Sequence, residues 1–201
     1  MAVGRLSIGA GLSSGMLAVP VTPASVSVGS GSATVSGNGQ VSFSGASRIS
    51  VNSCFNATYD NYRIIFSPSA SVGVDSTLSF RYRASGSDIS ASNYTGQRLV
   101  YFGTTIVASI NVTGNTQQSL SLIDGTTADR YFLNLEVYGP FLSRKKLLRA
   151  NINTIGNNGT VYGETHAGWN DTATPVDGFS IYTGGTSITG TLRVYGYANG
   201  A

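Results

Sequence analysis

Cysteine and histidine each occur only once in this chain, as Cys54 and His166. A single cysteine cannot form an internal disulfide, and no thiolate cluster can assemble around a metal ion. A zinc site with several histidine ligands is excluded for the same reason. Cys54 stands beside Phe55, a context typical of a small buried apolar residue. The sequence therefore predicts no metal and no cofactor.

Charged residues are also scarce. They make up 10% of the 201 residues, against about 25% in a typical soluble protein. Glutamate and lysine occur twice each, so the chain is poor in residues that favour helices. Threonine, valine, tyrosine and phenylalanine are common instead, and these residues suit pleated sheets. The composition predicts an all-β protein.

The net charge of +3 comes from few acids rather than many bases. It is too small to indicate nucleic-acid binding. The only basic cluster is RKKLLR, residues 144–149. Its favoured interpretation is a solvated turn leading into a strand, and the alternative is contact with an acidic partner or an anionic polymer.

Residues 1–45 are dominated by Gly, Ser, Ala, Val and Thr, and the first aromatic residue is Phe43. Glycines and serines interrupt the start of the chain too often for a signal peptide or a membrane span. We expect an extended arm or short strands that pack on something else, such as a neighbouring subunit; disorder is the alternative. Synthesis in a host cytosol and no membrane insertion are expected.

From residue 46 onward, alternation of apolar and polar residues predicts about ten short strands separated by Gly- and Asn-rich turns. No segment has helical periodicity, and no repeat suggests a propeller. The favoured fold for residues 46–201 is an antiparallel β-sandwich, jelly-roll-like in form. The expected strands are 62–67, 78–84, 97–107, 109–112, 119–123, 131–138, 148–152, 160–166, 179–182 and 188–198.

Few residues are suited to catalysis. On a strand, Tyr162, Glu164 and His166 would share one face, which could bring a base beside a carboxylate. However, no second histidine, no G-x-S-x-G sequence and no phosphate-binding loop accompany them. The sequence therefore predicts a protein that is not an enzyme.

The same stretch is the only place where Trp, His and two acids lie within ten residues. It could bind a saccharide, with an aromatic ring as stacking platform and polar groups as hydrogen-bond partners. The favoured alternative makes Trp169 a core residue, whose replacement by alanine would cost about 3–5 kcal/mol. The carbohydrate-binding candidates are Trp169, Tyr162, Glu164, His166 and Asp171.

Two stretches of the chain carry a distinctive pattern. The first is YDNYRIIF followed by TLSFRYRASGSDISASNYTGQ, and the second is GWND, DGFSIY and SITGTLRVYGY. The first resembles a strand pair of bacteriophage virion proteins in which the second strand ends in an S-G-x-D turn, and the second is similar to the end of the same module. The matched positions are Tyr59, Tyr62, Arg63, Arg81, Arg83, Gly86, Asp88, Asn93, Tyr94, Trp169, Gly190, Tyr195 and Gly196.

This resemblance covers roughly residues 55–198. It implies a jelly-roll-like β-sandwich of a tail-tip, receptor-binding, fibre or head-decoration protein, often assembled as a trimer. It brings no catalytic residues. The implied function is a non-enzymatic structural protein of the virion, in the tail at its receptor-binding tip; capsid decoration, a head fibre or a lectin-like module contacting host glycan are the alternatives. Copies of the chain, other virion proteins and host glycan are the implied partners.

The last expected strand has Ile188, Leu192 and Val194 on one face. Arg193, Tyr195 and Tyr197 fall on the other face. Tyr and Arg are enriched at protein interfaces, so these three residues are predicted to form a subunit interface. The alternative is an ordinary half-exposed strand with tyrosines reaching into solvent.

Overall fold

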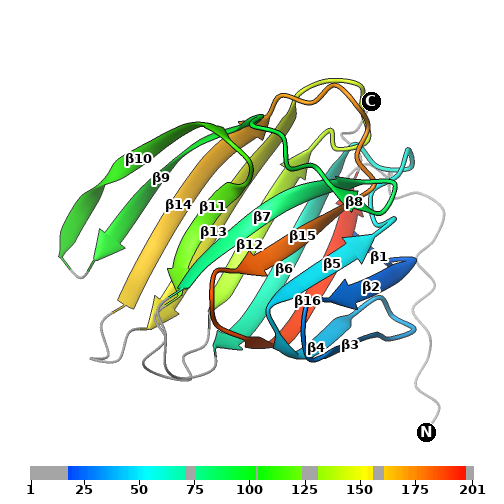
Figure 1. Ribbon diagram of the computed structural model, residues 1–201, viewed down its shortest axis with the longest axis horizontal. Coiled ribbons are helices and arrows are strands. Elements are labelled where there is room, and N and C mark those ends of the chain that lie inside the picture. Colours follow the sequence, from blue (N-terminus) through cyan, green and yellow to red (C-terminus); the bar gives the residue numbers. More distant parts are fainter. Residues whose placement is uncertain (1–17, 71–75, 103, 124–130, 156–160, 198–201) are drawn as a thin grey trace, which may run out of the picture.

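The computed structural model describes residues 18–70, 76–102, 104–123, 131–155 and 161–197 (Figure 1). These residues form two antiparallel β-sheets that pack face to face, and no helix is found among them. The prediction of an all-β antiparallel sandwich is confirmed. The jelly-roll-like form stays a prediction.

The larger sheet has the strand order β10-β9-β14-β13-β12-β6-β16-β4-β3, and β1 also pairs with β16. In Figure 1, β10 and β9 lie at one end of this sheet and the first strands of the chain at the other. Its strands are β1 (Val19–Val21), β3 (Ser32–Val35), β4 (Val41–Ala46), β6 (Asn61–Ala70), β9 (Tyr94–Phe102), β10 (Thr105–Asn115), β12 (Phe132–Tyr138), β13 (Lys146–Ile155), β14 (Val161–Asn170) and β16 (Ile188–Tyr197).

The smaller sheet has the order β11-β7-β15-β5-β2, and the short β8 pairs with β7. It lies across the larger sheet in Figure 1. Its strands are β2 (Ser25–Val28), β5 (Arg48–Asn52), β7 (Ser76–Ala84), β8 (Ser87–Asp88), β11 (Gln118–Ile123) and β15 (Gly178–Thr183).

The core lies between the sheets and follows the period-2 alternation of the strands. Leu133, Leu135 and Val137 of β12 are fully buried. Phe55, in the segment after β5, joins the two sheets. Its ring lies 4.7 Å from the ring of Tyr62 in the larger sheet and 5.7 Å from that of Phe179 in the smaller one. Cys54 beside it is also buried, which raises the pKa of its thiol.

The first strands depart from the expected arm. β1, β3 and β4 belong to the larger sheet and β2 to the smaller one, all paired with strands of the same chain. The short strands predicted for this part of the chain are present, and they pair within the chain, while packing on a neighbouring subunit stays a prediction. Residues 19–46 therefore continue the sandwich without a break at residue 45. The part of the predicted arm before residue 18 lies outside the described residues.

A second correction concerns the strand expected at 97–107. The chain reverses there, and β9 and β10 form an antiparallel pair in which Phe102 lies opposite Thr105. Leu99–Phe102 and Ile106–Val107 are both apolar stretches of residues that suit strands, so the sequence alone resembles one bent strand.

Candidate functional site

The outer face of the larger sheet carries a row of side chains that is open to solvent. Trp169 is 41% exposed and Leu147 is 52% exposed, both high values for large apolar residues. The two residues pair directly across β14 and β13. Extending the same register in both directions gives four adjacent positions, here called the Trp169 row: Thr95, Trp169, Leu147 and Tyr138.

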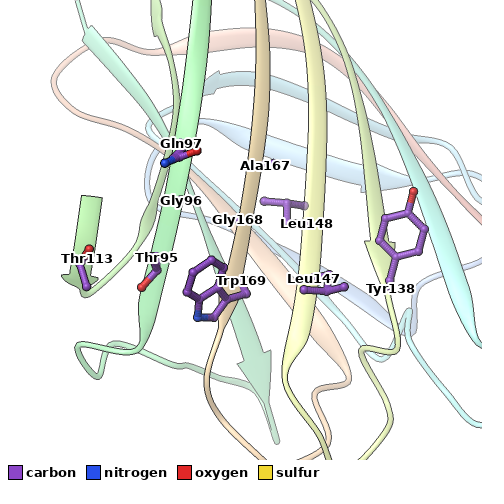
Figure 2. Close-up of a pocket in the computed structure, with 10 residues that line it drawn as sticks. All are labelled: Thr95, Gly96, Gln97, Thr113, Tyr138, Leu147, Leu148, Ala167, Gly168 and Trp169. Atoms are coloured by element: carbon purple, nitrogen blue, oxygen red, sulfur yellow. The ribbon is translucent and has the colours of Figure 1, made fainter. Parts of the chain in front are cut away.

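This row lines a pocket of about 560 Å³ (Figure 2). In Figure 2 the Trp169 ring lies between the side chains of Thr95 and Leu147, with Tyr138 beyond Leu147. Adjacent strands are about 4.8 Å apart, so the row spans about 14 Å across the sheet. None of the lining residues is charged. They are Thr95, Gly96, Gln97, Thr113, Tyr138, Leu147, Leu148, Ala167, Gly168 and Trp169.

Two ion pairs flank the pocket. Lys145 contacts Asp171 at 2.8 Å just beyond the end of β14. On the Tyr138 side, Arg63 contacts Glu136 at 2.7 Å, and the Tyr138 hydroxyl donates to the other Glu136 oxygen at 2.6 Å. That hydrogen bond and the Arg63 guanidinium hold the pKa of Glu136 below its ordinary value. Burial and the adjacent carboxylate raise the pKa of Tyr138 to about 12.

The opposite face of β14 points between the sheets. His166 is buried and its Nε2 lies 2.8 Å from the Gln118 amide nitrogen on β11. Burial, reinforced by the nearby Arg98 cation, lowers the pKa of His166 to about 4. Glu164 lies 3.5 Å from Arg98 of β9 on the same inner face.

Two glycines make room for this inter-sheet contact. A Cβ on Gly96 would lie 2.1 Å from the Gln118 amide nitrogen, and one on Gly168 would lie 2.6 Å from its amide oxygen. The Gln118 side chain therefore occupies the space that side chains at these two positions would need. Behind the outer pocket, the sandwich is held together by a hydrogen bond as well as by apolar contact.

The predicted carbohydrate residues are thus divided between two faces. Tyr162, Glu164 and His166 share the inner face, as their spacing predicted, whereas Trp169 points outward and Asp171 lies beyond the strand with Lys145. They do not form one site.

The favoured prediction that Trp169 belongs to the core is wrong. His166, Gly168 and Asn170 are the buried positions of β14. Because side chains alternate along a strand, Trp169 between them must point outward.

Sequence reasoning missed three members of the Trp169 row. Leu147 and Leu148 are adjacent in a strand, so one of them had to face outward. Leu148 is buried and Leu147 is exposed. Tyr138 is two positions after Glu136 and four after Asn134, so the period of two residues places all three on the outward face of β12. Only the pairing of β14 with β9 places Thr95 beside Trp169.

The predicted interface residues lie on this same outer face. Ile188, Leu192 and Val194 are buried, while Arg193, Tyr195 and Tyr197 are each partly exposed, which confirms the predicted alternation. Arg193 donates to the Gln40 side chain at 3.0 Å. Tyr195 lies opposite Arg63 of β6 on one side and Pro20 of β1 on the other. Their role in subunit contact stays a prediction.

The basic cluster 144–149 forms a turn and the start of β13, as predicted. Lys146 does not follow the prediction that this cluster is solvated. Its side chain is buried and its ammonium group donates to the carbonyl oxygens of Leu142 and Arg144. This lysine closes the turn that precedes β13.

Within the described residues, no group of three or more His, Cys, Asp and Glu side chains could hold a metal ion. That part of the chain also contains no apolar helix long enough to span a membrane. Comparison of the chain with protein-family models, curated proteins and solved structures found no match.

Proposed function

We propose that this chain is a non-enzymatic structural protein of a bacteriophage virion, of the receptor-binding type, and that it binds a saccharide through the Trp169 row. The virion context rests on the resemblance of residues 55–198 to virion proteins. The observation that carries the binding role is the exposed Trp169 ring in a pocket that no charged residue lines.

A saccharide suits this surface for two physical reasons. The face of a sugar ring is apolar and stacks on Trp, which offers a large rigid contact area. The hydroxyls at the ring edge need hydrogen-bond partners, and Thr95, Gln97 and Tyr138 provide neutral ones. Shallow exposed pockets of this kind bind by stacking and a few placed polar groups.

The proposed assembly is a homotrimer that contacts other virion proteins. Arg193, Tyr195 and Tyr197 remain the proposed contact residues. Capsid decoration is the alternative position in the virion, and it would use the same fold.

The saccharide role is tested on a glycan array with three proteins: the wild type, Trp169→Ala and Phe132→Ala. Phe132 is the matched control, because it is an aromatic residue of the same outer face, 47% exposed, outside the Trp169 row. We expect the Trp169 variant to lose binding and the Phe132 variant to keep it. If the wild-type protein binds no glycan on the array, the saccharide role is overturned.

The virion role is tested separately by mass spectrometry of purified particles, which should contain the chain in a fixed copy ratio to the capsid protein. Light scattering on the purified chain tests the trimer. Absence of the chain from the particles would overturn the virion assignment without affecting the glycan result.

A further inference from the structure

Two arginines border the Trp169 row without a direct ion pair among the described residues. Arg149 is exposed on β13, two positions after Leu147 and on the same face. Arg144 lies in the turn before β13, and its guanidinium is close to Gly139, the residue after Tyr138. Within the described residues, neither arginine has a carboxylate oxygen within 4.0 Å.

The nearby acids are already occupied. Glu136 contacts Arg63 and the Tyr138 hydroxyl, and Asp171 contacts Lys145. Glu136 lies opposite Arg149 in the strand register, and Arg149 helps to lower the pKa of this carboxyl, but the direct ion pair of Glu136 is with Arg63. The rim of the pocket therefore has an excess of positive charge around a neutral floor.

The register places this positive charge within reach of a stacked sugar. Arg149 pairs with Ala167, which is two positions from Trp169 on the same face of β14. Such diagonal neighbours have Cβ atoms about 7–8 Å apart, within reach of long side chains. Ala167, directly opposite Arg149, lines the pocket together with Trp169, and its small side chain leaves room beside the indole.

We propose that the Trp169 row takes an anionic saccharide, a sugar chain bearing carboxylate or phosphate groups. Trp169 stacks on a sugar ring, and Arg149 binds the acidic group of that ring or of the next one. The planar guanidinium presents paired donors that match a carboxylate or a phosphate. Arg144 adds a second cation at the Tyr138 side. This inference rests on the proposed function, because it names the ligand class of the same site.

The test uses isothermal titration of the full chain with three sets of oligosaccharides of equal length: neutral, uronic-acid-containing and phosphorylated. The variants are Arg149→Gln, Trp169→Ala and Arg81→Gln. Arg81→Gln is the matched control, since it removes the same charge from β7, a strand of the other sheet. Melting curves establish that each variant is folded.

We expect the acidic oligosaccharides to bind at least about tenfold more tightly than the neutral ones, the value of one charge-assisted hydrogen bond. Arg149→Gln should remove this preference and leave neutral binding unchanged, and Arg81→Gln should behave like the wild type. Added salt should weaken binding of the acidic ligands only. Whether uronic acids or phosphorylated sugars bind more tightly identifies the source of the anion.

Three results would overturn the inference. In the first, neutral and acidic ligands bind with equal affinity, Arg149→Gln binds both as the wild type does, and Trp169→Ala binds neither. This result would reject the anionic class and leave the proposed saccharide role intact. Binding of acidic ligands that survives in Trp169→Ala would show attraction to charge alone, without a stacked sugar. If none of the three sets binds, both the inference and the saccharide role fail.

Discussion

The outer faces of the two sheets differ in how their side chains are satisfied. On the smaller sheet, Arg83 donates to Asp88 at 2.5 Å, to Ser180 at 3.0 Å and to Ser50 at 3.2 Å. Ser180 also donates to Asp88, at 2.6 Å. Ser50 and Ser180 are fully buried although they lie on an outward face. The hairpin through β8 covers them, and every member of this cluster has a partner.

On the outer face of the larger sheet, the described residues form no comparable cover over the Trp169 row. Trp169 and Leu147 stay about half exposed, and no hydrogen bond within the chain can satisfy an apolar surface of this kind. Hydrogen bonds within the chain can thus satisfy the groups of a polar outer face. An apolar outer face is removed from water only when another molecule covers it. The contrast teaches that the smaller sheet's outer face contributes to stability through its own hydrogen bonds, whereas the larger sheet leaves exposed the apolar surface on which the proposed binding depends.

The largest expected effect is on the polar cluster. Arg83→Met should lower the free energy of unfolding by about 3–5 kcal/mol, because the Asp88 carboxylate, in a side chain only 14% exposed, loses its cation. Arg81→Met, on the neighbouring outward position, should cost under about 1 kcal/mol, since Arg81 only stacks on the Tyr182 ring. Denaturant unfolding measures both. Equal losses in the two variants would break the comparison, as would loss of saccharide binding in Arg83→Met.

An intermediate effect on stability is expected when acid protonates His166, whose contact with Gln118 lies behind the Trp169 row. The pKa of His166 is about 4 in the folded chain against an ordinary 6.5. Between these values the unfolded chain binds a proton that the folded chain does not, so stability rises with pH. The free energy of unfolding therefore has its full value above pH 6.5, and it falls by about 3 kcal/mol as the pH drops to about 4.

Unfolding curves between these pH values measure this loss. His166→Gln keeps a partner for Gln118 but cannot titrate, so it should remove most of the pH dependence in this range. The lowered pKa of Glu136 also makes the protein less stable in acid, and that smaller part should remain. A full pH dependence in the variant would contradict the role given to His166.

The smallest effect on stability is expected at Trp169. Because this ring is 41% exposed, Trp169→Ala should cost only about 1–2 kcal/mol of unfolding free energy. Phe179→Ala, at a fully buried position between the sheets, should cost about 3–5 kcal/mol. Melting curves of the two variants measure the difference. A loss at Trp169 as large as that at Phe179 would place the indole in the structural rather than the binding part of the molecule.

The sequence by itself determined the class of the fold and much of its core. Side chains alternate strictly along a strand, so Tyr62, Ile64 and Phe66 had to share a face, and all three are buried. The same rule placed Arg193, Tyr195 and Tyr197 together and united Glu164 with His166. These are local consequences of a period of two residues, which neighbouring strands do not change.

Only the tertiary structure decided which side of each strand meets the core and which strands are neighbours. Trp169 was expected inside, but the pairing of β14 between β13 and β9 turns His166 inward to Gln118 and the indole outward. Thr95 and Tyr138, 31 positions or more from Trp169 in the chain, join its row through strand register alone. Register depends on contacts between distant segments, and a pattern within one strand does not contain that information.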